Sequence, residues 1–232
     1  MKQYILREYG SWAVMTLSYL TGLVVSGRPT AGSLAVFIAI ALYINSKQAF
    51  VLWLRHRGEN PVRSLVIFLL QVFFATLMLL LFLGDSLLSL MPYILVPFAY
   101  LLSLKFLGEH SVVTEMSGFV LLALSSLVAK LSITGVVDPT LFVGTAVFFT
   151  AAVFKVRVQF KKGFVQRVIM VIYIGFAIAV YRTLSIPVIV LLPLADNLLF
   201  SISLYRAKLS FTGWVEVLKG VVFLLLMALN YR

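Results

Sequence analysis

The sequence predicts an all-α, polytopic integral membrane protein with nine transmembrane helices, and three observations lead to this fold class. Hydrophobic residues make up 62% of the 232 residues and charged residues only 12%, about half of what a soluble domain carries. The mean hydropathy is +1.08. The apolar residues also fall into long runs, without the alternation of period two that is typical of barrel strands. Such a chain has too few polar side chains to cover a water-soluble body.

Each predicted helix is a run of about 20 mostly apolar residues, enough to cross roughly 30 Å of hydrocarbon, and it ends at charges, Pro or Gly. No shift in composition marks a second domain, so residues 1–232 are expected to form one transmembrane domain. The connectors are short, which makes successive helices antiparallel neighbours. In chain order, with the residues that follow, the runs are Tyr9–Val25 (Ser-Gly-Arg-Pro), Ala31–Leu54 (Arg-His-Arg-Gly), Val62–Leu83 (Gly-Asp), Leu87–Leu104 (Lys), Ser111–Leu131 (reaching Gly and Asp-Pro), Thr140–Val156 (Arg), Phe164–Tyr181 (Arg), Leu184–Leu204 (Tyr-Arg) and Phe211–Leu229 (Asn-Tyr-Arg).

The distribution of basic residues predicts that the N-terminus is cytoplasmic, because Lys and Arg accumulate on the inner side of a membrane. With nine spans, 15 of the 19 basic residues fall on the inner segments and 4 on the outer ones. The inner set is Lys2, Arg7, Lys47, Arg55, Arg57, Arg63, Lys105, Lys155, Arg157, Lys161, Lys162, Arg167, Arg206, Lys208 and Lys219. The outer set is Arg28, Lys130, Arg182 and Arg232.

Composition also bounds the chemistry and the partners. The chain has no cysteine and two histidines, which excludes disulfides, thiolate nucleophiles and histidine metal clusters. It lacks the phosphate-binding, hydrolase and zinc-protease motifs of soluble enzymes, and its eight carboxylates offer no evident magnesium cage. We expect no metal and no cofactor, and no nucleic-acid partner despite the net charge of +11. Membrane lipids, or a phosphorylated ligand, are the expected partners of the basic inner face of a cell-membrane protein.

A weak internal repeat divides the chain into halves of about 1–107 and 108–210, followed by one further helix. The segments from Arg7 to Gly27 and from Gly108 to Val128 each place a Glu before or at the start of a span. Each half also has a basic loop after its second helix. Repeated halves are a common way to build a membrane cavity, and the alternative is chance similarity between apolar segments.

The strongest candidate site is the polar cluster Asn45, Ser46, Lys47 and Gln48 inside the second run. An ionisable group in a span is unfavourable by roughly 2.5–3.5 kcal/mol and usually faces a bundle interior or a water-filled cavity. Snorkelling of Lys47 to the head groups is the alternative. The neighbouring amides and hydroxyl favour a cavity, because snorkelling explains a lone Lys better than a cluster.

Asp196 is the second candidate, near the middle of the eighth run, where Pro187 and Pro193 precede it. It is interpreted either as a proton, ion or ligand site or as a structural pair between helices. Glu115 is expected to pair with Lys105 or Lys47.

The basic loops form a third candidate, with Arg55 and Arg57 in one loop and Lys155 and Arg157 at the start of the other. Either they are topology determinants, or they converge on one anionic ligand, since Arg donates paired hydrogen bonds to phosphate.

The sequence also resembles two known groups of membrane proteins. The opening around Arg7, Gly10, Ser11 and Trp12 resembles the start of the YwiC-like membrane proteins, over mainly the N-terminal third. The nine-helix count, with a polar second helix and basic loops after the second and sixth, looks like the UbiA-type prenyltransferases, whose architecture implies a UbiA-like helical bundle.

The catalytic motif of the prenyltransferases is absent. The resemblance places Asn45 on the family's Asn, but Ser46, Ala49 and Trp53 stand where three Asp ligands of Mg²⁺ belong, and only Arg57 falls on a basic position. The second Asp-rich motif is missing as well. The resemblance therefore implies a polar, cationic vestibule without metal ligands.

The function expected from these residues is binding of an anionic amphiphile, an isoprenoid or lipid phosphate, in a cationic vestibule that opens to the cytoplasm. Its ligand-binding residues would be Asn45, Ser46, Lys47, Gln48, Arg55, Arg57, Lys155, Arg157 and Asp196. A divergent UbiA-like prenyltransferase is one alternative, and a transporter of a small solute or ion that uses Asp196 is the other.

Overall fold

The computed structural model of the protein describes residues 4, 6, 8–27, 29–54, 61–203 and 208–231. Within these ranges it is all helical, with no strand. The elements are α1 (Tyr9–Ser26), α2 (Ala31–Leu54), α3 (Pro61–Leu83), η2 (Gly84–Ile94), α4 (Leu95–Leu107), α5 (Val112–Thr134), α6 (Pro139–Lys161), α7 (Phe164–Thr183), η3 (Val188–Leu194), α8 (Ala195–Ser203) and α9 (Leu209–Asn230). The all-helical class is confirmed, and each expected run coincides with one of these α-helices or with a 3₁₀ segment and the α-helix after it.

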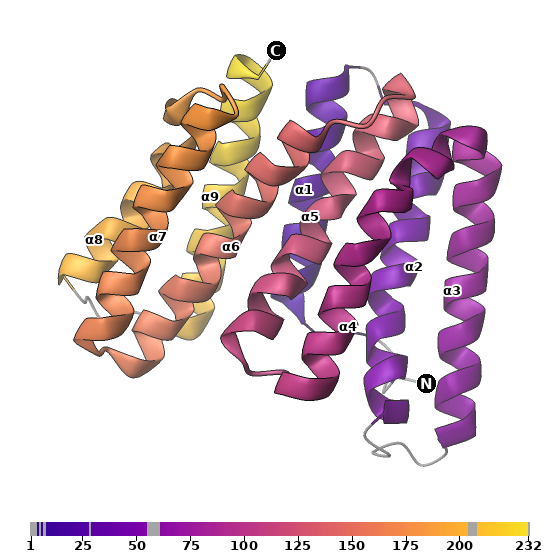
Figure 1. Ribbon diagram of the computed structural model, residues 1–232, viewed down its shortest axis with the longest axis horizontal. Coiled ribbons are helices and arrows are strands. Elements are labelled where there is room, and N and C mark those ends of the chain that lie inside the picture. The colour runs from indigo at the N-terminus through magenta and orange to yellow at the C-terminus, as the bar shows by residue number, and fades with distance from the viewer. Residues whose placement is uncertain are drawn as a thin grey trace.

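Successive helices run in opposite directions along a common axis, so the chain ends lie at opposite ends of the bundle (Figure 1). The helices α1 to α5 form one side of the molecule and α6 to α9 the other. The run from α3 to α4 is continuous in helical structure but folds back on itself at Gly84, whose φ of +52° is a conformation that glycine adopts without steric cost.

The fourth and eighth runs begin as 3₁₀ helices, which the apolar pattern does not predict. Pro92 lies inside η2 and Pro193 inside η3. Proline has no backbone N–H and clashes with the carbonyl four residues earlier, which disfavours the regular α-helical ladder. Tighter 3₁₀ turns take its place until α4 and α8 begin.

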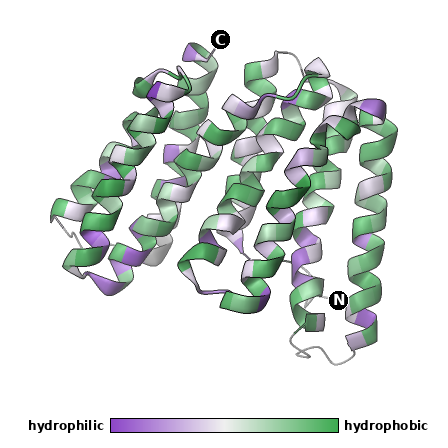
Figure 2. Ribbon diagram, viewed as in Figure 1, coloured by the Kyte–Doolittle hydropathy of each residue, from purple (hydrophilic) through white to green (hydrophobic). Residues whose placement is uncertain are grey.

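Six helical segments among the described residues are long and apolar enough to cross a membrane. They are Ala31–Leu54, Pro61–Leu107, Val112–Thr134, Pro139–Lys161, Phe164–Thr183 and Phe211–Asn230. Hydrophobic residues cover most of each helix and hydrophilic ones gather toward the ends (Figure 2). Large apolar side chains such as Phe73, Leu81 and Ile172 are exposed on the bundle's outside, as lipid contact requires. The chain is thus a multi-pass membrane protein, and the count of nine spans stays a prediction.

The helices pack closely against one another. Most of α6 is buried, which makes it a central helix. The backbones of α1 and α5 approach so closely at Gly22 that a Cβ there would lie 2.2 Å from the Ser126 carbonyl oxygen. Small residues at helix interfaces allow this approach inside a membrane. The hydroxyl of Ser125 also donates to the Met15 carbonyl at 3.0 Å, which fixes the register of the pair.

Candidate functional site

A cavity of about 800 Å³ lies between α1, α2, α3, η2, α4 and α5. Its wall is mostly apolar, with side chains such as Ile40, Phe68, Val72, Leu90 and Phe119. The polar side chains that line it include one group drawn from the ends of α1, α2, α4 and α5: Glu8, Ser11, Lys47, Tyr100, Glu109, His110, Thr114 and Glu115. This volume is within the 300–1,000 Å³ typical of small-molecule sites.

Lys47 is the cation of this polar group. Its ammonium contacts both oxygens of Glu8, at 2.7 and 2.9 Å, and Tyr100 lines the same cavity. The side chain of Lys47 is 23% exposed and that of Glu8 43%. The pair therefore lies at a partly open edge of the cavity.

Glu8 directly precedes α1, but its side chain does not cap the helix. It accepts hydrogen bonds from Lys47 and, at 2.7 Å, from the Ser11 hydroxyl. Burial by itself raises the pKa of Glu8, but the hydrogen bonds and charge of Lys47, helped by Ser11, outweigh burial and hold that pKa below its ordinary value. Glu8 is thus an anion at neutral pH.

Asn45 fixes the segment that carries Glu8. Its side-chain oxygen accepts from the Leu6 N–H at 3.0 Å, and its amide donates to the Tyr4 carbonyl at 3.3 Å. The indole of Trp12 donates to the Leu6 carbonyl at 3.0 Å. These bonds place Leu6 in the cavity wall, so Asn45 acts on the site through the backbone of residues before α1.

The other residues that were predicted to bind a ligand near Lys47 differ in where they lie. Ser46 lines the cavity but its hydroxyl donates to the Tyr43 carbonyl at 2.6 Å. Gln48 is on α2, outside the described cavity lining. Arg55 and Arg57 lie outside the described residues, so their role as a rim stays a prediction.

Lys155 and Asp196 come together in a second polar cluster, on the other side of the bundle. Lys155 is hydrogen-bonded to Asp196, and its ammonium is 2.9 Å from Glu216. Lys219 completes the cluster, 2.7 Å from Glu216 and 3.6 Å from Asp196. These four residues are called the quartet. Lys155 is only 1% exposed, and the two positive charges balance the two negative ones.

The quartet is tied to the surrounding helices by Asn197, which accepts a hydrogen bond from Lys219 and donates to the Ala151 carbonyl at 3.4 Å. Sequence reasoning missed Glu216 and Lys219 as partners of Asp196. Their signal is the spacing of three residues within α9, which puts opposite charges on one helix face inside a span.

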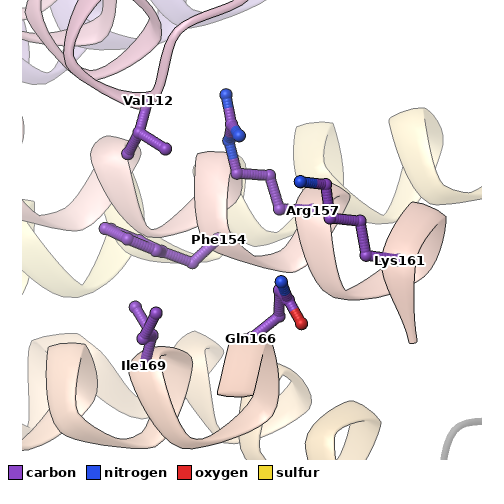
Figure 3. A pocket seen from close by; sticks show the side chains of 6 residues that line it. All are labelled: Val112, Phe154, Arg157, Lys161, Gln166 and Ile169. Atoms are coloured by element: carbon purple, nitrogen blue, oxygen red, sulfur yellow. The ribbon is translucent and has the colours of Figure 1, made fainter. Parts of the chain in front are cut away.

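Arg157 connects the two sides near the same end of the bundle. It donates to Glu115 at 2.8 Å and to the His110 carbonyl at 2.9 Å, so the expected pairing of Glu115 with Lys105 or Lys47 is replaced by Arg157. A small cavity of about 150 Å³ lies beside it. Arg157 and Lys161 line this small cavity from α6, and Gln166 and Ile169 line it from α7 (Figure 3).

At the opposite end of the bundle, Asp138 caps α6: its carboxylate accepts a hydrogen bond from the Leu141 N–H at 3.0 Å. The same carboxylate pairs with Lys130 at 2.6 Å and accepts from the Tyr231 hydroxyl at 2.8 Å. Burial raises the pKa of Asp138, but these hydrogen bonds and the Lys130 charge outweigh it and hold that pKa below its ordinary value. This cluster ties the C-terminal end of α9 to the loop before α6.

Comparison with known protein families gives a match. The family model of YwiC-like proteins matches residues 5–130, more than half of the chain. The chain belongs to the YwiC-like family. All described lining residues of the large cavity, from Leu6 to Val128, fall inside the matched region. The cavity is thus part of the YwiC-like region.

No curated protein and no solved structure matches the chain, so the UbiA-like architecture of this YwiC-like protein stays a prediction. Among the residues that the structure describes, no group of three or more His, Asp or Glu side chains is arranged to hold a metal ion.

Proposed function

We propose that this YwiC-like membrane protein binds an anionic amphiphile, an isoprenoid or lipid phosphate, in the cavity beside Lys47. The observation that carries the proposal is one apolar cavity of about 800 Å³ with an ammonium group in its wall. The charged head group would lie beside Lys47 and the tail between α2, α3, α4 and α5. Lipid-soluble molecules with a polar head have this division of chemistry.

The direction of the helices supports a cytoplasmic head-group end and nine spans. The termini lie at opposite ends of the bundle (Figure 1), as an odd number of passes requires. The described helix ends and connectors at the N-terminal end carry Lys161, Lys162 and Lys208, whereas the helix ends at the opposite end carry Lys130 and Arg182. Since Lys and Arg accumulate on the cytoplasmic side, the N-terminal end would be cytoplasmic, and Lys47 lies about 11 Å from that end of α2 at 1.5 Å per residue.

The lining supports a ligand with a long apolar part rather than a small ion. Phe68, Val72 and Leu79 from α3 line the cavity together with Ile94 from η2 and Leu101 from α4. An apolar wall of this kind favours a hydrophobic ligand, because burying apolar area stabilises a complex by about 25 cal/mol per Å². A hydrated ion gains nothing from such a wall.

Native mass spectrometry of the detergent-purified protein with farnesyl phosphate tests the proposal. Lys47→Ala should weaken retention about tenfold or more, the equivalent of one hydrogen bond to a charged group. Leu121→Trp, which fills the cavity from α5, should weaken it as well. Leu102→Trp on the exposed side of α4 is the matched control and should bind like wild type.

Circular dichroism and gel filtration of each variant check that the fold is intact. Equal retention of farnesyl phosphate by folded wild type, Lys47→Ala and Leu121→Trp would remove the basis of the proposal.

A further inference from the structure

Two lysines occupy the same position in the two halves of the chain. Lys47 is sixteen residues beyond the first residue of α2, and Lys155 is sixteen residues beyond the first residue of α6. The helices α2 and α6 are the second helices of the two halves, α1 to α4 and α5 to α8, and they run in the same direction in the bundle (Figure 1). The two ammonium groups are therefore at matching depths.

Each lysine has a partner on the fourth helix of its half, although at different positions: Tyr100 is the sixth residue of α4 and Asp196 the second residue of α8. The fourth helix of each half begins with a 3₁₀ segment, η2 or η3. The tetrapeptides Pro97 to Tyr100, Pro-Phe-Ala-Tyr, and Pro193 to Asp196, Pro-Leu-Ala-Asp, follow the same pattern. Tyr100 lines the same cavity as Lys47, and Asp196 accepts a hydrogen bond from Lys155. In both halves the tetrapeptide ends on a residue that belongs to the same site as the lysine.

The two halves differ in the charge that faces the lysine. Beside Lys155, two carboxylates come from helices of the bundle, Asp196 from α8 and Glu216 from α9, the helix that follows the second half, and Lys155 is 1% exposed. In the first half the matching residue is Tyr100, which is uncharged. The ion pair that the described residues give Lys47 is with Glu8, which is outside any helix and 43% exposed.

We propose that the Lys47 site is the open counterpart of the Lys155 site, in which Glu8 stands in for a missing internal carboxylate and an anionic head group takes its place. The inference rests on the proposed function and deepens it by assigning the head-group chemistry. A phosphate or carboxylate beside Lys47 and the Tyr100 hydroxyl replaces the Glu8 carboxylate, and Glu8, on the segment held by Asn45, turns outward to water.

Because Glu8 and the ligand compete for Lys47, removing the Glu8 charge should increase the affinity for the ligand. Removing one partner of an ion pair usually weakens a site, but Glu8→Gln removes a competitor for Lys47 and should tighten farnesyl phosphate binding about tenfold, the worth of one hydrogen bond to a charged group. Tyr100→Asp supplies the internal carboxylate of the second half and should weaken binding by about the same factor. Asn has nearly the size of Asp but no charge, so the Tyr100→Asn variant should bind farnesyl phosphate more tightly than Tyr100→Asp.

The experiment is a titration of the detergent-purified full chain with farnesyl phosphate by microscale thermophoresis, with farnesol as the tail-only probe and inorganic phosphate as the head-only probe. Asp85→Asn, which removes an exposed negative charge at the other end of the bundle, controls for net charge and should bind like wild type. Farnesyl phosphate should bind more tightly than either partial probe.

Every result of this titration supports or overturns the inference. Weaker or unchanged binding by Glu8→Gln overturns the inference, and so does equal binding by the folded Tyr100→Asp and Tyr100→Asn variants. If Tyr100→Asp does not fold, Glu8→Gln decides alone. Equal binding of farnesol and farnesyl phosphate, without an effect of Glu8→Gln, overturns the head-group assignment while the amphiphile cavity stands. No binding of either tailed probe overturns the proposed function itself.

Discussion

Replacing Lys155 by Met tests whether the quartet is a structural device of the C-terminal side. Met has a similar length and no charge, so the packing of the side chain is largely kept. The substitution leaves Asp196 and Glu216 to share Lys219, which is 2.7 Å from Glu216 but 3.6 Å from Asp196. Of its ion pairs with Lys155 and Lys219, Asp196 would lose the shorter and keep the longer.

The magnitude follows from burial. Breaking a buried ion pair by removing one partner usually lowers stability by about 3–5 kcal/mol. Since Asp196 is 29% and Glu216 23% exposed, water relieves part of that loss, and we expect a value near the lower limit. The double variant Lys155→Met/Asp196→Asn restores charge balance and keeps the pair of Lys219 with Glu216. It should recover about 1–2 kcal/mol of the loss, a coupling typical of residues in one network.

The assay is equilibrium unfolding in mixed micelles of dodecyl maltoside and sodium dodecyl sulfate, followed by circular dichroism. Lys161→Met, at the exposed end of the same helix, is the matched control and should change stability by less than about 0.5 kcal/mol. Additive losses in the double variant would show that charge balance in the quartet contributes nothing, and the structural interpretation would then be wrong.

Three further predictions concern the rest of the bundle. Asn45→Ala should accelerate hydrogen exchange at the Leu6 amide about tenfold, because one hydrogen bond is lost; unchanged exchange would contradict the geometry. Asp138→Ala should destabilise more than Asp138→Asn by about 1 kcal/mol, since Asn still caps the helix. The pKa of Asp138 is lowered in the folded state, so its stabilising effect is present above the ordinary value of 3.8 and lost as pH falls through the lower folded value. Melting curves should show a larger acid loss in wild type than in Asp138→Asn. Gly22→Ala should lower stability by about 1–3 kcal/mol through overpacking, whereas Gly175→Ala, with open space around it, should not.

Most of the fold can be predicted from the sequence, because a helix that crosses a lipid bilayer needs about 20 mostly apolar residues in succession. Apolar runs of span length, bounded by charges, Pro or Gly, gave the positions of the helices to within a few residues over most of the chain. The 3₁₀ segments η2 and η3 were not predicted, since hydropathy is the same in either kind of helix. Pro92 and Pro193 mark them, but a proline alone does not tell a kink from a change of helix type.

The candidate site was predicted less completely. A lysine within an apolar run drew attention to Lys47, and the structure brings it to a cavity wall. Tyr100 carried no signal, because it is one of ten tyrosines and its role depends on the cavity that α2 and α4 line together. Glu8 and Asn45 meet the site through contacts about 40 residues apart in sequence. Local patterns do not encode such contacts.

The most direct test of the central claim is an experimental density map of the protein in lipid nanodiscs with farnesyl phosphate, at a resolution that shows side chains. We expect elongated density in the cavity, with its head at Lys47 and its tail between α2, α3, α4 and α5. A cavity filled by collapsed side chains, or a Lys47 ammonium turned outward to the acyl chains, would contradict it.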